Sequence, residues 1–246
     1  MKLALVTGGH RRLGAAISAR LAADGWALAI HGAQDATPDV ALAAALAQAG
    51  VKWHGFVADL SDPILVEKLL PEVTAHFGSP PTLVVNNAAR FGQDDASSAD
   101  AASLADHLSV NFQAPVALML ALHRTGAGGA IVNIVDQRIR NPVPDQLSYS
   151  LSKAALASAT RTLAVALAPH IRVNAVAPGL TIPTDDYDAA AMARAAAAMP
   201  LERLPSPDDI ASAVAWLAGA TSVTGQTLFV DGGASLKSFA RDFAHL

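Results

Sequence analysis

The 246-residue sequence contains no cysteine, little charge and few aromatic residues. Without cysteine there is no disulfide, no thiolate nucleophile and no cysteine-ligated metal site. Acidic residues outnumber lysine and arginine by 21 to 17, so the chain lacks the basic surface that nucleic acids require. The first apolar run ends at Gly8 and Gly9, which makes it too short for a signal peptide or a membrane span. We therefore predict a cytoplasmic protein with no nucleic-acid or membrane partner.

Charge and histidine spacing narrow the prediction further. Charged residues make up 15% of the chain. Soluble proteins usually contain about a quarter, so part of the surface is expected to be buried in an oligomer. The eight histidines nowhere follow one another at the spacing of metal ligands. We predict that the protein holds no metal ion.

Short β-rich segments alternate with alanine-rich helical segments along the whole sequence. This alternation is typical of an α/β protein whose parallel sheet is covered by helices on both faces. Right-handed crossovers then give a doubly wound, Rossmann-like fold with a mainly parallel, seven-stranded sheet, in one domain over residues 1–246. Strands are predicted at residues 2–7, 26–31, 51–58, 82–86, 130–135, 171–176 and 226–230, and helices at 13–23, 40–49, 64–77, 101–123 and 147–168.

The segment of residues 181–200 differs from this pattern, because it is rich in alanine and lies between prolines. It fits an ordinary surface helix. It also fits a substrate lid over the ligand crevice, and its place directly after the sixth predicted strand favours the lid.

A glycine-containing turn from Thr7 to Gly14 follows the first predicted strand and opens the first predicted helix. In that context Gly8 and Gly14 let the backbone approach a pyrophosphate, which is held at the helix N-terminus. Because the strand and the helix are both present, we predict a dinucleotide-binding turn rather than a plain tight turn.

Tyr149 and Lys153 stand four residues apart, on one face of a predicted helix. A lysine held beside a tyrosine favours the phenolate, so Lys153 is expected to draw the pKa of the Tyr149 phenol towards neutrality. Tyr149 would then serve as a general acid or base. Asp136 follows the fifth predicted strand and completes a candidate catalytic set, because the crevice of such a sheet opens at the carboxyl ends of its strands.

These motifs, in this order, resemble the short-chain dehydrogenase/reductase family over essentially the whole chain. The matching residues are Thr7, Gly8 and Gly14 in the first turn, Asn86 to Ala89 after strand four, Tyr149 and Lys153, and Pro178-Gly179 after strand six. The resemblance implies an NAD(P) cofactor and a homotetramer. It also implies that Asp59 contacts adenine and that Asn111 holds a proton-relay water near Lys153. The remaining cofactor contacts that it implies are Arg11, Arg12, Leu13, Asn87, Ala88 and Thr181.

The chain departs from the family pattern at two positions. Arg12 replaces a glycine of the first turn, and Asp136 replaces the catalytic serine. The two changes are either drift in a crippled enzyme or, taken together, the pattern of the pteridine reductase subgroup, which it resembles more closely. Phe91 matches the aromatic residue that stacks on the pterin in that subgroup, and Leu180 is expected to line the nicotinamide side.

The chemistry of C=N reduction makes an aspartate sensible at position 136. An ionised carboxylate would repel the alkoxide that forms when a ketone is reduced. Reduction of a ring C=N bond instead needs a proton at nitrogen, which Asp136 can help Tyr149 to deliver. The same carboxylate can accept hydrogen bonds from an amino-pyrimidine ring. Arg12 can bind a cofactor phosphate and a pterin acceptor with the same planar fork.

The identity of the cofactor depends on the end of the second predicted strand, where an acid would bind the ribose of NAD. Gly32 and Ala33 occupy that place, and Asp35 follows slightly later. The lack of an acid at that place and, above all, the resemblance to pteridine reductases, which use NADPH, imply NADPH in preference to NADH. The substrate is expected to be a dihydropterin such as dihydrobiopterin or dihydromonapterin, or the larger dihydrofolate.

Two other functions remain open: a carbonyl or alcohol dehydrogenase acting on another ketone, and a catalytically silent nucleotide-binding protein. The tail from Ser235 to Leu246 is a candidate to reach a neighbouring subunit's site.

Overall fold

The computed structural model describes residues 2–183 and 187–245 and shows a seven-stranded, all-parallel sheet in the order β3-β2-β1-β4-β5-β6-β7. This confirms the predicted Rossmann-like α/β fold. The strands are β1 (Leu3–Val6), β2 (Ala27–Gly32), β3 (Trp53–Val57), β4 (Leu83–Asn86), β5 (Gly129–Ile134), β6 (Ile171–Pro178) and β7 (Thr227–Val230).

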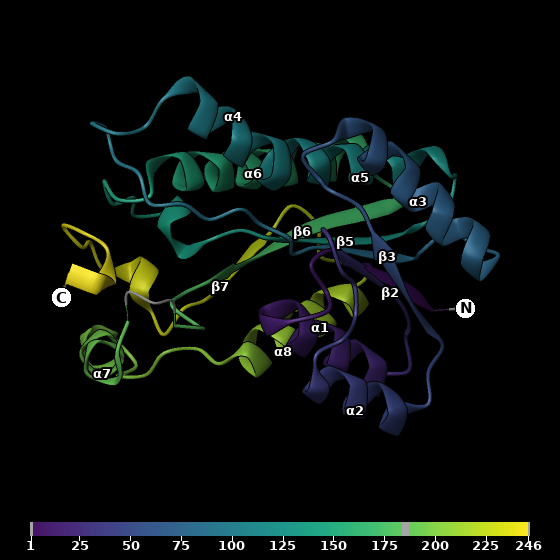
Figure 1. The fold of residues 1–246 in the computed structure, drawn as a ribbon, viewed down its shortest axis with the longest axis horizontal. Helices are drawn as coiled ribbons and strands as arrows, with labels where there is room; N and C mark the ends of the chain where they lie inside the picture. Colours follow the sequence, from purple (N-terminus) through teal and green to yellow (C-terminus); the bar gives the residue numbers. More distant parts are fainter. Residues whose placement is uncertain (1, 184–186, 246) are drawn as a thin grey trace.

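Helices cover both faces of the sheet (Figure 1). One face carries α1 (Arg12–Ala23), α2 (Val40–Ala49) and α8 (Pro207–Gly219). The other carries α3 (Pro63–Phe77), α4 (Ala101–Leu108), α5 (Ala114–Arg124) and α6 (Leu147–Ala166). A further helix, α7 (Ala189–Ala198), lies beside the C-terminal segment at one end of the molecule.

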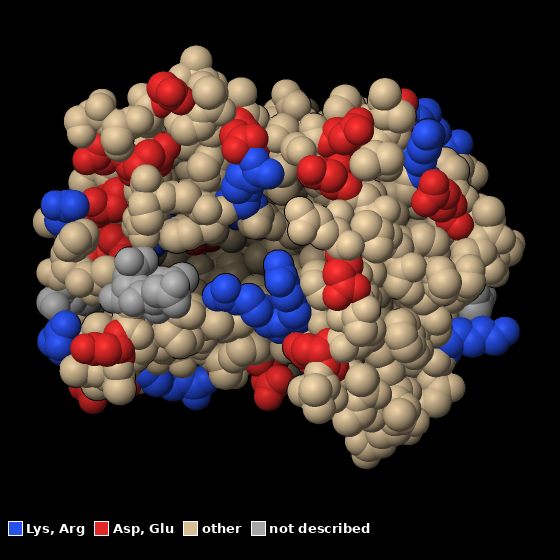
Figure 2. All heavy atoms as spheres, in the orientation of Figure 1, with Lys and Arg blue, Asp and Glu red and all other residues tan. Residues whose placement is uncertain are grey.

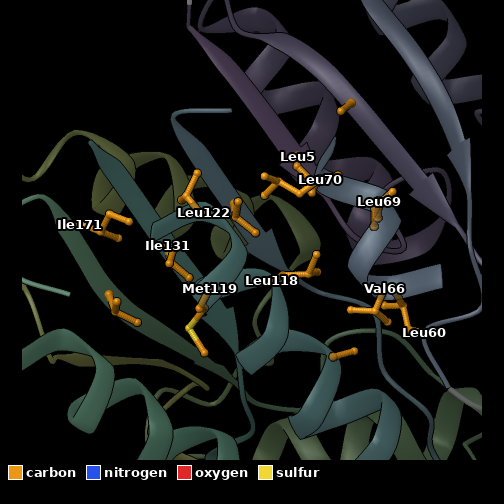
Figure 3. Packing of buried hydrophobic residues seen from close by; sticks show 14 of the residues in the cluster. Leu5, Leu60, Val66, Leu69, Leu70, Leu118, Met119, Leu122, Ile131 and Ile171 are labelled. Atoms are coloured by element: carbon orange, nitrogen blue, oxygen red, sulfur yellow. The ribbon is translucent and has the colours of Figure 1, made fainter. Parts of the chain in front are cut away.

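The apolar core lies in two layers because successive side chains of each strand point to opposite faces of the sheet. In β1, Leu3 and Leu5 face the layer under α3 and α5, whereas Ala4 and Val6 face the layer under α1 and α8. Figure 3 shows the first layer, in which leucines of α3 and α5 meet side chains of the central strands. The fully buried strands therefore read in the sequence as continuous apolar runs.

Two helical regions differ from the prediction. The single helix expected over residues 101–123 is divided by a π-helical turn, Ser109–Gln113, which brings Asn111 into the interior. Such turns are frequent at functional sites. Helix α8 was not predicted, although Ser206, Pro207 and Asp209 carry the signature of a helix start.

The part of the chain that the structure describes offers neither a metal site nor a membrane-spanning helix. Within residues 2–183 and 187–245, no group of three or more His, Cys, Asp or Glu side chains is placed to hold a metal ion. None of the helices in the same residues is long and apolar enough to cross a membrane.

The start of α8 gives a test of the fold. Ser206 Oγ accepts a hydrogen bond from the Asp209 N–H (3.2 Å), and Asp209 Oδ2 accepts one from the Ser206 N–H (2.8 Å). Ser206→Ala should therefore lower the free energy of unfolding by about 1 kcal/mol in urea denaturation. Ser158→Ala, at an exposed position within α6, is the matched control and should leave stability unchanged or slightly raised. Equal effects of the two substitutions would contradict the assignment.

Candidate active site

A cavity of about 590 Å³ opens at the carboxyl ends of the strands, where β1 and β4 lie side by side although they are far apart in sequence. This is the switch point at which doubly wound sheets bind their ligands. Figure 2 shows a hollow in this face of the molecule with basic side chains at its rim. The arginines that line the cavity are Arg11, Arg12, Arg90 and Arg138.

The turn between β1 and α1 forms one end of the cavity and fits a pyrophosphate. Gly8 adopts a φ of +59°, and a Cβ on Gly14 would lie 1.9 Å from the Gly8 carbonyl oxygen, so both positions require glycine. Helix α1 begins without a side chain that accepts from its first turn, whereas α2 and α3 are capped by Asp39 and Asp62. The first N–H groups of α1 are therefore available to an anion.

Thr7 supports this turn from behind and does not itself line the cavity. Its hydroxyl oxygen accepts hydrogen bonds from the N–H groups of Asn87 and Ala88, both at 3.0 Å. The Asn87 amide in turn donates to the carbonyl oxygens of Thr7 (2.9 Å) and Gly8 (3.2 Å). These bonds tie the loop after β4 to the turn after β1, which explains why the two motifs occur together.

The end of β2 carries no acid that faces the cavity. A Cβ on Gly32 would lie 1.8 Å from the Asp35 carbonyl oxygen, so no side chain fits there, and the next residue is Ala33. Asp35 accepts hydrogen bonds from the Thr37 N–H and hydroxyl (2.9 and 2.7 Å) and does not line the cavity. Asp35 is thus a loop residue.

Two histidines that the sequence did not single out lie at this end of the cavity. His31 is buried; its Nδ1 accepts from the Gly8 N–H at 3.1 Å, and its Nε2 donates to the Ala58 carbonyl at 2.8 Å. Burial lowers the pKa of His31, so its ring is neutral and holds the turn against β3. His10 also lines the cavity, and its Nδ1 is buried with no hydrogen-bond partner among the described residues.

Arg12 has a left-handed backbone, with φ +52°. An L-residue in this conformation costs about 1 kcal/mol, which glycine does not incur. The turn therefore favours glycine at this position on structural grounds, and the arginine is retained at a cost. Its side chain is exposed at the cavity mouth.

Asp136 and Tyr149 meet at the floor of the cavity. The Tyr149 hydroxyl donates to Asp136 Oδ2 at 3.2 Å, and Asp136 Oδ1 accepts from the Arg138 N–H at 2.8 Å. Phe91 stands edge-on to Tyr149, with ring centroids 4.9 Å apart and 71° between the planes. Phe91 is 46% exposed, so one face of its ring is free to stack.

The predicted fall in the pKa of Tyr149 is contradicted. Burial raises the pKa of the Tyr149 phenol well above its ordinary value, the negative charge of Asp136 raises it further, and the positive charge of Arg138 acts against both. The Lys153 ammonium lies 5.7 Å from the centre of the Tyr149 ring and donates to the Ile134 carbonyl at 2.7 Å. Tyr149 is therefore protonated at neutral pH and suited to give a proton rather than to take one.

The pKa of Lys153 is also shifted. It is only 2% exposed, and burial lowers its pKa to about 8, with Asp136 acting in the opposite direction. The lysine is thus mostly charged at neutral pH and loses its proton in mildly alkaline solution.

Asn111 does not line the cavity but fixes the residues that do. Its amide exchanges hydrogen bonds with the main chain of Arg90, at 2.7 and 2.9 Å. It also donates to the Ser152 hydroxyl at 2.9 Å, and that hydroxyl donates to the Tyr149 carbonyl at 2.6 Å. The side chain therefore orients the turn of α6 that carries Tyr149; its role in holding a relay water stays a prediction.

The far end of the cavity is closed by the segment after β6 and by the C-terminal residues. Leu180, Thr181, Ile182 and Tyr187 line it, together with Asp242 and Phe243. The predicted lid is in part the helix α7, and its residues 184–186 lie outside the described residues. The movement of this segment as a lid over the cavity stays a prediction.

Sixteen of the predicted site residues line this one cavity. They are Gly8, Arg11, Arg12, Leu13, Gly14, Asp59, Asn87, Ala88, Phe91, Asp136, Tyr149, Lys153, Pro178, Gly179, Leu180 and Thr181. Their individual roles in binding and catalysis stay predictions.

The comparison with known protein families agrees with this geometry. The family model described as enoyl-(acyl carrier protein) reductase matches residues 9–235. This span runs from within the turn after β1 to just beyond β7. The chain belongs to the short-chain dehydrogenase/reductases. It is therefore an NAD(P)-dependent oxidoreductase acting on a small-molecule substrate.

Relatives in this family carry several activities. The chain is 36% identical to an uncharacterised oxidoreductase of Mycobacterium tuberculosis, over 94% of this chain and 91% of the relative. It is 34% identical to a putative ketoacyl reductase of granaticin polyketide synthase from Streptomyces violaceoruber, over 95% and 96%. The structure of FolM alternative dihydrofolate reductase 1 from Brucella canis, in complex with NADP, is 37% identical, with a TM-score of 0.86 and coverage of 96% and 94%.

Several cavity residues of this short-chain dehydrogenase/reductase were missed by sequence reasoning. Arg138, Tyr187, Asp242 and Phe243 line the substrate end, yet they belong to no local motif. The only sequence signal was the closeness of Arg138 to Asp136. His31 could have been found as a polar residue in an apolar strand.

The backbone of Arg12 leads to a prediction about stability and binding. Arg12→Gly relieves the left-handed strain but makes the unfolded chain more flexible, so the free energy of unfolding should change by less than about 1 kcal/mol. Arg12→Ala changes neither the left-handed strain nor the flexibility of the unfolded chain, so its free energy of unfolding should also stay within about 1 kcal/mol of the wild type. Both should weaken NADPH binding equally in a fluorescence titration. Full NADPH affinity in either variant would show that the arginine serves another purpose.

Lys153 leads to a prediction about stability and pH. Between about pH 8 and the usual lysine pKa, the unfolded chain binds a proton that the folded chain does not, so wild-type stability rises with pH there. Lys153→Met should abolish turnover yet raise the free energy of unfolding by on the order of 3 kcal/mol at neutral pH. The gain should shrink as the pH rises above 8. The control is Lys52→Met, at an exposed position. The difference between its free energy of unfolding and that of the wild type, taken from denaturation curves at several pH values, should not change with pH.

Proposed function

We propose that this protein reduces a pterin, converting a dihydropterin to the tetrahydropterin with NADPH. The observation that carries the proposal is Asp136 at the place of the family serine, accepting a hydrogen bond from the Tyr149 hydroxyl. A carboxylate next to a reacting ketone would oppose the developing alkoxide. The same carboxylate suits a reaction in which a proton must reach a ring nitrogen.

The state of Tyr149 supports the direction of this reaction. A phenol with a raised pKa keeps its proton at neutral pH but is a weaker acid, so it donates only to a strongly basic atom, such as the nitrogen that hydride addition to the neighbouring carbon creates. Asp136 orients the hydroxyl, so that hydride addition to carbon and proton transfer from Tyr149 to nitrogen together give a neutral ring N–H and a Tyr149 phenolate. Lys153 donates a hydrogen bond to the Ile134 carbonyl, and its ammonium adds a positive charge near the floor of the cavity.

The cofactor end of the cavity supports NADPH over NADH. At the end of β2 no acidic side chain lines the cavity, which favours the extra phosphate of NADP, and the exposed Arg11 lines the same cavity. When bound, the nicotinamide supplies the hydride. The uncapped start of α1 and the close-packed Gly8 and Gly14 fit its pyrophosphate.

Phe91 and Arg12 are the residues we assign to the pterin ring. Phe91 offers a free aromatic face, and Arg12 offers a planar fork of donors at the cavity mouth. The likeness to the NADP-bound FolM structure, whose name gives alternative dihydrofolate reductase, supports the same substrate class. Dihydrobiopterin, dihydromonapterin and dihydrofolate are the substrates to compare.

A carbonyl reductase is the second candidate. It is favoured by the 34% identity to the granaticin ketoacyl reductase and by the intact Tyr149 and Lys153, which serve ketone reduction equally well. Asp136 is the feature that speaks against it. A silent nucleotide-binding protein would bind NADPH without passing hydride to any substrate. The homotetramer and the cytoplasmic location stay predictions.

The test of function is NADPH oxidation with the three pterins and with a panel of ketones, for the wild type and two variants. Asp136→Ala should lower pterin turnover by at least about a hundredfold, because proton delivery is lost, and leave NADPH binding nearly unchanged. Asp136→Ser restores the family residue and should shift the preference towards ketones. Oxidation of NADPH by ketones alone in the wild type, or unchanged pterin turnover in Asp136→Ala, would refute the proposal.

A further inference from the structure

The last described residues of the chain lie against its own active site. Phe243 and Phe239 pack with Ala195 and Met199, which joins the C-terminal segment to α7. Figure 1 shows the two side by side beyond the end of β7. Asp242 and Phe243 line the cavity of the chain to which they belong, and a reach of the tail to a neighbouring subunit stays a prediction.

Asp242 is the best-anchored residue of this segment. It is buried, and its main-chain N–H donates to Asp145 Oδ2 at 2.6 Å. Its Oδ1 accepts from the Tyr187 hydroxyl at 2.6 Å and from the Ala244 N–H at 3.1 Å. Its Oδ2 forms an ion pair with the guanidinium of Arg138. Three partners thus hold the buried carboxylate, and a fourth holds the main chain of the same residue, so Asp242 is fixed in place.

Arg138 connects this carboxylate to the catalytic pair. Its side chain is 11% exposed and lines the cavity, and its own N–H holds Asp136 Oδ1. The charged and titratable groups facing it are Asp136, Asp242, Tyr149 and Tyr187; together they raise the pKa of the guanidinium although burial acts in the opposite direction. The cation is therefore permanent.

We propose that Asp242 and Arg138 are positioning residues of the reaction. The Asp242 side-chain carboxylate holds the Arg138 guanidinium beside Tyr149. There the positive charge of the guanidinium balances the negative charge of Asp136. Without that cation, the negative charge of Asp136 would act on the Tyr149 phenol with no opposition from Arg138, and the Lys153 ammonium is bound to the Ile134 carbonyl. The proton donor would become weaker. The inference rests on Tyr149 as proton donor in the proposed function, but not on pterin as the substrate.

The experiment separates the effect of the Arg138 charge on kcat from the effect of its side-chain volume. Arg138→Met keeps the apolar stem and removes the charge, so kcat should fall by about tenfold or more, which corresponds to one pKa unit in the proton donor. The KM for NADPH should stay unchanged. Arg138→Lys keeps the charge and should recover much of the loss, which a role in packing alone would not produce. Arg140→Met is the matched control, because Arg140 lies over Phe229 at 4.1 Å and does not line this cavity.

A double-mutant cycle tests the contribution of the tail. If Asp242 acts by holding Arg138, Asp242→Asn should lower kcat, and the double variant with Arg138→Met should be no slower than Arg138→Met alone. Thermal unfolding of each variant verifies that it is folded. Wild-type kcat in Arg138→Met, equal losses in Arg138→Met and Arg138→Lys, or additive losses in the cycle would overturn the inference.

The same measurements separate the inference from the proposed function. Turnover of ketones but not pterins would reject the pterin proposal alone. The kcat values of the double-mutant cycle would then be measured with the ketone as substrate. Turnover of pterins with no effect of Arg138→Met would reject the inference alone. Absence of turnover with every substrate would reject both.

Discussion

The negative charge of Asp136 constrains the whole substrate end of this protein. A carboxylate at the floor of a partly closed cavity must be balanced, and the balance comes from three directions: the Tyr149 hydroxyl, the Arg138 guanidinium and, nearby, the Lys153 ammonium. In a relative with a serine at this position no such balance is needed. The aspartate and the cations around it are thus parts of one arrangement, which supports the proton delivery that we propose.

The arrangement is possible because the strands are all parallel. Their carboxyl ends meet at one edge, so residues from β1, β2, β4, β5 and β6 reach one cavity although they are far apart in sequence. At the nucleotide end, hydrogen bonds from Asn87 to the main chain of Thr7 and Gly8 hold two of these strand ends together. The sheet supplies the position, and the loops supply the chemistry.

The fold and the cofactor end were predictable because their signals are local. A strand, a glycine turn and a helix occupy consecutive residues, and Gly8 and Gly14 are dictated by close backbone contacts. The electrostatics were not predictable in this way: Tyr149 and Lys153 share a helix face, yet the hydroxyl points to Asp136 and the ammonium to Ile134. The pairing of Arg138 with Asp242 spans most of the C-terminal half of the chain, and no pattern in the sequence marks it.

The position of Asp242 and Phe243 has a consequence for how the protein is made. The turn after β1 is synthesised long before Asp242 and Phe243, which close the far end of the same cavity. A nascent chain can therefore shape its nucleotide site early but cannot finish its catalytic chamber until residue 243 is free to fold back. The order of synthesis therefore leaves the far end of the cavity open until residues 242 and 243 have been made.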